Sequence, residues 1–156
     1  MVFLEHPAVQ KVMEVSGIKL LNPMQQKALE AGLLEDTNFI VAAPTASGKT
    51  LLAEIKMLDV VKRNKKAIYV VPLRALANEK HDDLKEKYEK IGLKIALSVG
   101  DMDSADNWLA NYDIIVCTSE KLDSLMRHEV QWVSNVGLVV VDEIHLLDSA
   151  NRGPTL

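Results

Sequence analysis

Cysteine, aromatic residues and long apolar runs are all scarce in this sequence of 156 residues. The single cysteine, Cys117, lies in an apolar run, which excludes a disulfide framework and favours a reducing compartment. No apolar run approaches the ~18–20 residues of a membrane span, and the start of the chain carries an acid and a histidine where a signal peptide has basic and then apolar residues. We therefore expect a soluble, cytoplasmic protein that has no membrane partner.

Apolar residues make up 48% of the chain and charged residues 26%, which is enough to fill one core and excludes disorder. No internal repeat or flexible linker interrupts the sequence, so we expect a single domain over residues 1–156. The net charge is −4, yet residues 62–94 carry ten bases against five acids. Such a basic segment is compatible with binding to a nucleic-acid backbone, but it is also typical of a solvated helix face.

Short apolar runs rich in Val and Ile alternate with longer amphipathic stretches. The runs predict buried parallel strands over residues 38–43, 67–71, 94–99, 113–117 and 138–141. The stretches predict helices over residues 49–63, 74–91 and 120–128. This order is typical of an α/β fold with a mostly parallel sheet and helices on both faces, in which ligands gather at the carboxyl ends of the strands. A leading helical region within residues 1–34 precedes the first strand.

The first predicted strand leads into a loop of small residues that opens a helix. This is the context that a phosphate-binding loop requires, although Ala43 stands where the strict pattern has its first glycine. Backbone amides of such a loop surround a β-phosphate, Lys49 reaches the β- and γ-oxygens, and the Thr50 hydroxyl binds Mg²⁺. The residues predicted to bind ATP here are Pro44, Thr45, Ala46, Ser47, Gly48, Lys49 and Thr50. An ordinary turn with a helix cap is the alternative.

Two adjacent carboxylates follow the last apolar run directly. Asp142 is predicted to hold Mg²⁺, directly or through water, and Glu143 to orient and deprotonate the water that attacks a γ-phosphate. Lys49, Asp142 and Glu143 are therefore the predicted catalytic residues. No other His or Cys stands at ligand spacing from His145, so we do not expect zinc there.

These motifs resemble those of superfamily 2 helicases. The loop resembles their motif I, in which alanine commonly takes the first-glycine position, and Asp-Glu-Ile-His at 142–145 resembles the DExH form of motif II. Three further segments resemble the Q motif, motif Ia and motif Ib, at residues 20–25, 72–77 and 118–125. The segments are similar to those of archaeal DNA-repair helicases of the superkiller-like branch, relatives of the polymerase-theta helicase domain.

The resemblance implies a RecA-like P-loop NTPase lobe, with the Q motif carried by the leading helical region. Motif III and the second RecA-like lobe do not follow motif II in this sequence, which we therefore interpret as a first lobe alone. In this family Gln25 would hydrogen-bond the adenine edge. Gln26 is an equal chemical candidate, but the spacing after Pro23 favours Gln25.

The resemblance also implies contacts with nucleic acid. Arg74 and Thr118 would contact the sugar–phosphate backbone of a single strand, although Arg74 could be only a surface base and Thr118 only a helix cap. His145 is assigned to coupling between the nucleotide site and the rest of the motor, or it could be a helix-start histidine making one hydrogen bond. Trp108, Trp132 and Tyr112 are expected to pack in the core or at a lobe interface rather than to stack on bases. Cys117 is assigned no chemistry.

The expected function is therefore that of the ATP·Mg²⁺-binding lobe of a helicase that moves along single-stranded nucleic acid, with DNA favoured. Besides nucleic acid, the expected partner of this chain is a second RecA-like lobe, which would supply the arginines that hydrolysis needs. The first lobe alone is therefore expected to be nearly inactive. An RNA helicase of the same architecture is one alternative. A nucleotide-dependent switch that binds no nucleic acid is another, which the acidic net charge supports and the motif Ia and Ib matches oppose.

Overall fold

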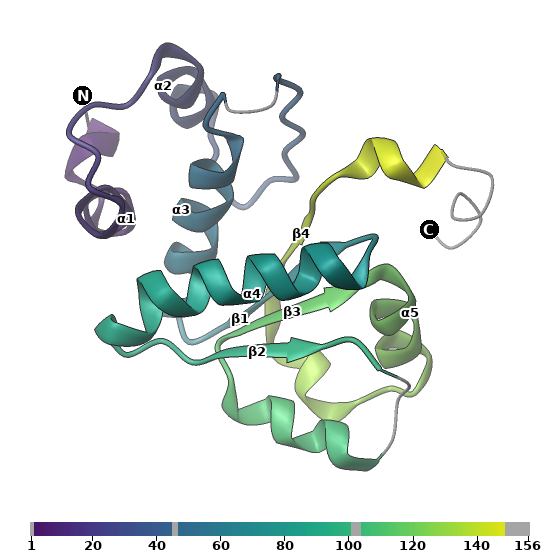
Figure 1. Cartoon of the computed structure of the whole chain (residues 1–156). Helices are drawn as coiled ribbons and strands as arrows, with labels where there is room; N and C mark the ends of the chain where they lie inside the picture. Colours follow the sequence, from purple (N-terminus) through teal and green to yellow (C-terminus); the bar gives the residue numbers. More distant parts are fainter. Residues whose placement is uncertain (1, 45–46, 101–103, 149–156) are drawn as a thin grey trace. The chain divides into compact units, whose positions relative to one another are not determined.

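The computed structural model describes residues 2–44, 47–100 and 104–148 (Figure 1). The chain divides into two compact units, residues 1–63 and residues 64–156, which are treated separately below. The first unit is helical and contains the phosphate loop, whereas the second contains the sheet and the acidic pair. None of the described helices combines the length and apolar character needed to cross a lipid bilayer.

Three α-helices and a short 3-10 helix build the first unit: η1 (Val2–Glu5), α1 (Pro7–Ser16), α2 (Pro23–Glu30) and α3 (Lys49–Lys62). Local sequence sets where α1 begins and ends. His6 caps its start by accepting a hydrogen bond from the Ala8 amide, and Gly17 ends it in the left-handed conformation. The buried face of α1 packs on α3, and the His6 ring lies 3.5 Å from Asp59 of α3.

The prediction of a strand over residues 38–43 is wrong. The structure has no strand there, and Ile40 is 91% exposed. A strand is stable only where another strand accepts its backbone hydrogen bonds. Residues 38–43 form no ladder of backbone hydrogen bonds with a described strand, so the apolar composition of this segment was not sufficient to make it a strand.

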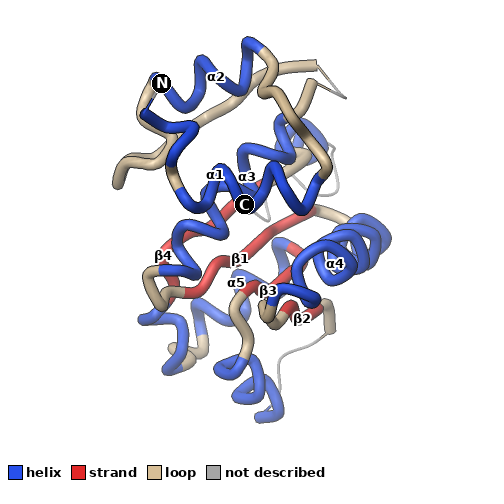
Figure 2. Tube along the Cα trace, turned by 90° about the vertical axis from the view of Figure 1, so that its left-hand side faces the viewer, coloured by secondary structure: helices blue, strands red, loops and turns tan. Residues whose placement is uncertain are grey.

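Four parallel strands form the sheet of the second unit, in the order β2-β3-β1-β4 (Figures 1 and 2). They are β1 (Lys66–Val71), β2 (Ile95–Ser98), β3 (Ile114–Thr118) and β4 (Val136–Val141). In the register, Val71 lies beside Thr118 and Val70 beside Val141. The carboxyl ends of β1, β3 and β4 are therefore aligned at one edge of the sheet, which confirms the predicted arrangement.

Helices pack on both faces of this sheet, as predicted. The helices of this unit are α4 (Arg74–Tyr88), η2 (Glu89–Ile91), η3 (Ser104–Asn111), α5 (Ser119–Arg127), η4 (Gln131–Asn135) and η5 (Ile144–Asp148). On one face, Ile68 and Val70 of β1 form a buried cluster with Leu125 of α5 and Trp132 of η4. Because neighbouring side chains alternate across a strand, Tyr69 points to the opposite face, where α4 packs.

Candidate nucleotide-binding site

The phosphate loop ends in a glycine that opens α3. Gly48 is the N-cap of this helix with φ +92°, a left-handed conformation that glycine adopts without steric cost. The helix starts at Lys49, so its first backbone N–H groups point toward the loop as an anion site requires. The Ser47 amide donates to the Pro44 carbonyl at 3.2 Å. Of the predicted loop residues, Thr45 and Ala46 lie outside the described residues.

Two side chains of the Q motif hold the backbone of this loop. Asn22 Nδ2 donates to the Ser47 carbonyl at 2.8 Å, and Gln25 Nε2 donates to the Gly48 carbonyl at 3.2 Å. A Cβ atom at Gly48 would overlap with Gln25 Nε2 and crowd Asn22 Nδ2. Gly48 is therefore required both by its backbone conformation and by the close approach of these amides. Sequence reasoning missed Asn22, although an Asn before a helix-opening Pro is a recognisable cap.

Gln25 is buried, and both ends of its amide are engaged. Its Oε1 accepts from the Asn22 backbone amide at 2.9 Å, which together with the Asn22 side chain makes a reciprocal capping box. Its Nε2 supports the loop, which leaves one amide hydrogen for another partner. Gln26 Nε2 donates to the Leu21 carbonyl at 2.8 Å. Contact between Gln25 and adenine remains a prediction, and the structure gives this residue a second task.

The remaining loop side chains have chemistry that suits a phosphate. Ser47 Oγ is buried and has no hydrogen-bond partner among the described residues, so a phosphate oxygen could accept its hydrogen. Lys49 is half-buried at the first position of α3, and Thr50 follows it with an exposed side chain. A cationic amine, two hydroxyls and free helix-terminal amides together form a donor set for an anion.

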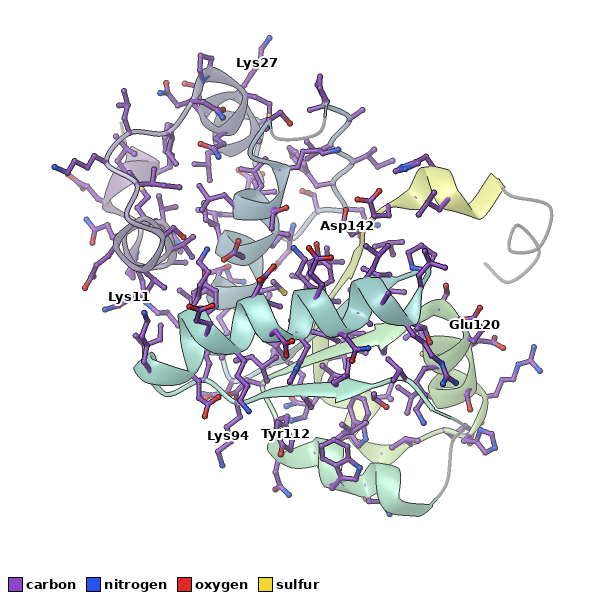
Figure 3. All side chains as sticks on the ribbon, in the orientation of Figure 1. Lys11, Lys27, Lys94, Tyr112, Glu120 and Asp142 are labelled. Carbon is purple, nitrogen blue, oxygen red and sulfur yellow. The ribbon has the colours of Figure 1, made fainter. Side chains whose placement is uncertain are left out.

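The acidic pair begins where β4 ends (Figure 3). The Asp142 amide donates to the Val70 carbonyl at 2.9 Å, which extends the pairing of β4 with β1 by one residue. Both carboxylate oxygens of Asp142 accept hydrogen bonds. Oδ1 accepts from the Glu143 amide at 2.9 Å, and Oδ2 accepts from the Tyr69 hydroxyl at 2.5 Å. The carboxylate is therefore fixed in direction by its own surroundings.

Glu143 turns the chain sharply after the strand. Its φ of +57° is left-handed, which is uncommon for a residue with a side chain, and it separates the direction of Glu143 from that of Asp142. His145 Nε2 lies 3.2 Å from Glu143 Oε2, and both side chains are partly exposed. His145 thus contacts the carboxylate predicted to act as the base.

A magnesium site is consistent with these donors. The described residues contain no cluster of three His, Cys, Asp or Glu side chains that could hold a metal alone. Magnesium is usually held by one or two protein oxygens together with waters and substrate phosphates, so one carboxylate and one hydroxyl are a sufficient protein contribution. Asp142 and Thr50 each have such an oxygen, and their contact with one ion stays a prediction.

Arg74 and Thr118 follow neighbouring strands at the same edge of the sheet. Arg74 is the exposed first residue of α4, directly after β1. Thr118 ends β3 and caps α5, with its Oγ1 accepting from the Lys121 amide at 3.4 Å. Because Thr118 is only 4% exposed, the cap is its role in this structure, and a contact with a strand remains a prediction.

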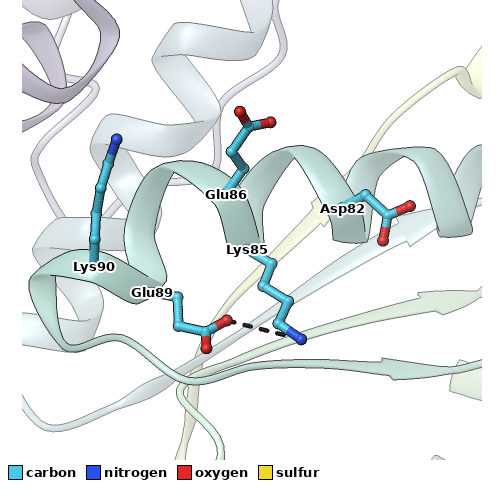
Figure 4. A pocket seen from close by; sticks show the side chains of 5 residues that line it. All are labelled: Asp82, Lys85, Glu86, Glu89 and Lys90. Atoms are coloured by element: carbon cyan, nitrogen blue, oxygen red, sulfur yellow. Dashed lines mark ion pairs between the residues drawn. The ribbon is translucent and has the colours of Figure 1, made fainter.

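The basic middle segment, residues 62–94, spans the end of α3, β1, α4 and η2, and the outer surface of α4 carries both signs of charge. Figure 4 shows Lys85 paired with Glu89 at 3.9 Å. The hollow on this side of the helix is lined by Asp82, Lys85, Glu86, Glu89 and Lys90. Acids and bases alternate here, as on a solvated helix face, so this part of α4 does not by itself make a site for a polyanion.

Trp132 and Cys117 are buried as expected, whereas Trp108 is not in the core. Trp132 is buried in the core cluster. Trp108 is 41% exposed and makes an edge contact with Tyr112, with ring centroids 5.2 Å apart. Cys117 is fully buried in β3, and burial raises the pKa of its thiol to about 12. These residues show no arrangement for chemistry.

A loop ending in Gly-Lys-Thr at a helix start and an acidic pair at the end of a parallel strand define the α/β class of P-loop nucleotide-binding proteins. The chain belongs to the DEAD/DEAH box helicase family, whose model matches residues 22–156.

Two curated relatives of the chain are helicases of archaea. It is 50% identical over 149 residues to the ATP-dependent DNA helicase Hel308 of Pyrococcus horikoshii, and 49% identical over 158 residues to that of Methanocaldococcus jannaschii. Both alignments cover 95% of the chain but only 21% and 13% of the relatives. The chain therefore spans about a fifth of their length or less.

Solved structures of helicases have the same fold. The helicase MrfA, bound to DNA and AMPPNP, matches 90% of the chain and 21% of its own length with a TM-score of 0.72 and 25% identity. A hypothetical ATP-dependent RNA helicase from Sulfolobus tokodaii matches 96% of the chain and 45% of its own length with a TM-score of 0.71 and 24% identity. The RecA-like fold class is thereby confirmed.

Proposed function

We propose that this chain is the ATP-binding lobe of an ATP-dependent helicase that moves along single-stranded DNA. The observation that carries the proposal is the backbone at Gly48, which opens α3 in a left-handed conformation and presents its first amides to the loop. The chemistry of the acidic pair and the similarity to archaeal DNA helicases support it. Residues 1–156 would form one lobe, with the Q motif in residues 1–34.

In the proposed mechanism the two parts of the site hold one nucleotide. The loop amides and Lys49 bind its phosphates, and the Thr50 hydroxyl and Asp142 hold Mg²⁺. When bound, this ion neutralises charge that develops on the phosphate oxygens. Glu143 orients the attacking water and accepts its proton. His145, which contacts Glu143, is placed to link this base to movement of the motor.

Hydrolysis also requires groups beyond these. Phosphoryl transfer in motors that resemble this chain uses arginines that stabilise the charge of the transition state, and we assign those to a second RecA-like lobe. The 156-residue chain alone should therefore bind ATP weakly and hydrolyse it negligibly. A rate comparable with that of an intact motor would contradict this assignment.

DNA is the proposed strand because the similar curated relatives are named as DNA helicases. Arg74 and the amides at the start of α5 would contact its phosphates. Such contacts do not distinguish the sugars unless a group reads the 2′-hydroxyl, so an RNA helicase is the alternative.

The test measures ATP hydrolysis by the full-length protein with single-stranded DNA and with RNA of matched sequence. We expect single-stranded DNA to stimulate ATP hydrolysis. Arg74→Ala should decrease this stimulation at raised salt. Greater stimulation by RNA would show that the strand in the proposal is RNA rather than DNA. Absence of stimulation by either strand would favour a nucleotide switch and refute the motor.

A further inference from the structure

The hydroxyl of Tyr69 contacts a residue that the proposed mechanism uses. Tyr69 lies in the middle of β1 and is 1% exposed. Its Oη donates to Asp142 Oδ2 at 2.5 Å, so a side chain from the middle of β1 contacts the acidic pair directly. Sequence reasoning assigned no task to this tyrosine.

The register of the sheet explains how the contact arises. Tyr69 lies beside Val140 in the pairing of β1 with β4. Asp142 follows two residues later and therefore lies on the same face of the sheet as Val140 and Tyr69. The Asp142 amide is held by the Val70 carbonyl, which fixes the backbone on which the carboxylate stands. A phenol is long enough to cover the remaining distance along the strand direction.

A lysine from α4 lies over the tyrosine ring. Lys80 Nζ is 5.3 Å from the centroid of the Tyr69 ring. A cation over an aromatic face is attracted to the ring and withdraws electron density from it, which makes the phenolic O–H a stronger donor. Lys80 and Asp142 therefore act on the phenol from opposite ends and favour the same hydrogen bond.

We propose that Tyr69 is a positioning residue for Mg²⁺: its hydroxyl orients the Asp142 carboxylate toward the metal of the bound nucleotide. This inference rests on the proposed function, because the metal arrives with ATP. The Glu143 amide occupies one lone pair of Oδ1 and the Tyr69 hydroxyl occupies one of Oδ2, which leaves one on each oxygen for the metal or its waters. Groups that orient a ligand in this way alter metal affinity without contacting the metal.

A purely structural role for the hydroxyl predicts a different result. A buried phenol needs a hydrogen-bond partner, and Asp142 could serve only as that partner. In that case, removal of the hydroxyl would lower the stability of the fold, and any change in affinity for the nucleotide would be equal with and without Mg²⁺. Positioning of the carboxylate predicts instead a change confined to the magnesium-dependent part of nucleotide binding.

The experiment uses Tyr69→Phe in the full-length protein and measures binding of AMPPNP by calorimetry, with EDTA and over a series of Mg²⁺ concentrations. We expect the Mg²⁺ concentration needed for half-maximal effect to rise about tenfold. Affinity in EDTA should stay unchanged, whereas the free energy of unfolding should fall whichever role the hydroxyl has, because a buried phenol–carboxylate hydrogen bond is lost. Tyr88→Phe is the matched control, because Tyr88 is also buried and has a lysine, Lys87, over its ring.

Lys80→Met is the second variant, and it keeps the hydroxyl in place. It should raise the Mg²⁺ requirement about two- to threefold, and it keeps the test available if Tyr69→Phe does not fold. An unchanged Mg²⁺ requirement in the folded Tyr69→Phe protein, or in Lys80→Met if Tyr69→Phe is unfolded, overturns the inference. So does an equal loss of affinity with and without Mg²⁺.

Asp142→Asn separates this inference from the proposed function. If wild type binds AMPPNP with a magnesium dependence that Asp142→Asn removes and Tyr69→Phe retains, only the role of Tyr69 is wrong. If wild type shows no magnesium-dependent binding, or Asp142→Asn retains it unchanged, the proposed function itself fails.

Discussion

Gly48 at the phosphate loop is more tightly constrained than Gly17 at the end of α1. Gly48 has both a left-handed backbone and two amide side chains where a Cβ would lie, whereas Gly17 is left-handed with nothing within 4 Å of that position. The two glycines therefore separate backbone strain from steric overlap. This difference is a direct test of how tightly the Q motif holds the loop.

We predict that Gly48→Ala lowers the free energy of unfolding by about 2–3 kcal/mol, because it combines left-handed strain with displacement of Gln25. Gly17→Ala should cost only about 1 kcal/mol, since strain is its sole effect. Urea unfolding of both variants measures the difference. Equal costs would show that Gln25 and Asn22 move aside freely.

Burial of Cys117 predicts how stability responds to alkaline pH. Burial raises the pKa of its thiol to about 12, so the folded state keeps the proton that the unfolded chain releases above about pH 8.5. The Cys117 thiol therefore contributes to the free energy of unfolding below about pH 8.5. This contribution is lost as the pH rises from about 8.5 toward 12.

Unfolding of wild type and Cys117→Ala from pH 7 to 11 measures this effect. The wild-type free energy of unfolding should fall more steeply above about pH 8.5 than that of the variant, because only wild type has the thiol. Parallel pH profiles for the two proteins would contradict the assignment of the alkaline slope to Cys117.

At the scale of elements, a buried lysine connects β1 to a 3-10 helix. Lys66 Nζ donates to the carbonyls of Ala110 and Tyr112, each at 2.6 Å, at the end of η3. Burial lowers the pKa of this amine, and Asp113 opposes the shift. The contact satisfies carbonyls that the helix end leaves without internal partners.

We predict that Lys66→Met destabilises the fold by about 1–3 kcal/mol, because it leaves two carbonyls without this donor. Lys65→Met is the matched control, since Lys65 is adjacent and exposed. Its effect should lie within about 0.5 kcal/mol of zero. Chemical denaturation of both variants compares them, and a similar small effect for both would show that Lys66 contributes no cap.

Most elements were predictable because each has a local signal. Apolar runs and amphipathic stretches located the four strands and the helices α3, α4 and α5 within a few residues of their observed bounds. The segment 38–43 has the same composition as a strand, yet the structure has none there, because a strand also needs a partner that shares its backbone hydrogen bonds. Local pattern could not supply that information.

The site residues were predictable where their motifs are continuous in sequence. Gly48 and Asp142 stand at the helix start and strand end that were expected. Asn22 and Tyr69 were missed, because their contacts depend on residues 25 and 73 positions away. A tyrosine inside an apolar strand does need a polar partner, and that signal could have identified Tyr69.

At the scale of the whole molecule, the chain corresponds to only part of a longer relative. It covers about a fifth or less of its curated relatives, and we propose that its part is to bind the nucleotide. Lys49 is the residue on which this proposed role depends most, because we assign it to the phosphates and it is only half-buried at the start of α3.

We predict that Lys49→Ala abolishes retention of a fluorescent ATP analogue while the free energy of unfolding changes by less than about 0.5 kcal/mol. Lys62→Ala, at the exposed opposite end of α3, should leave binding unchanged. Fluorescence titration compares both with wild type. Unchanged affinity in Lys49→Ala would refute the assignment of the loop.

The central claim is that one nucleotide and its metal join the loop at Lys49 and Thr50 to the carboxylates at Asp142 and Glu143. A crystal structure of the full-length protein with AMPPNP and Mn²⁺, with the metal located by its anomalous signal, tests it most directly. We predict an ion bound by the Thr50 hydroxyl and joined to Asp142 directly or through one water. An ion bound by only one of Thr50 and Asp142, with the other side chain turned away from the phosphates, would contradict the account.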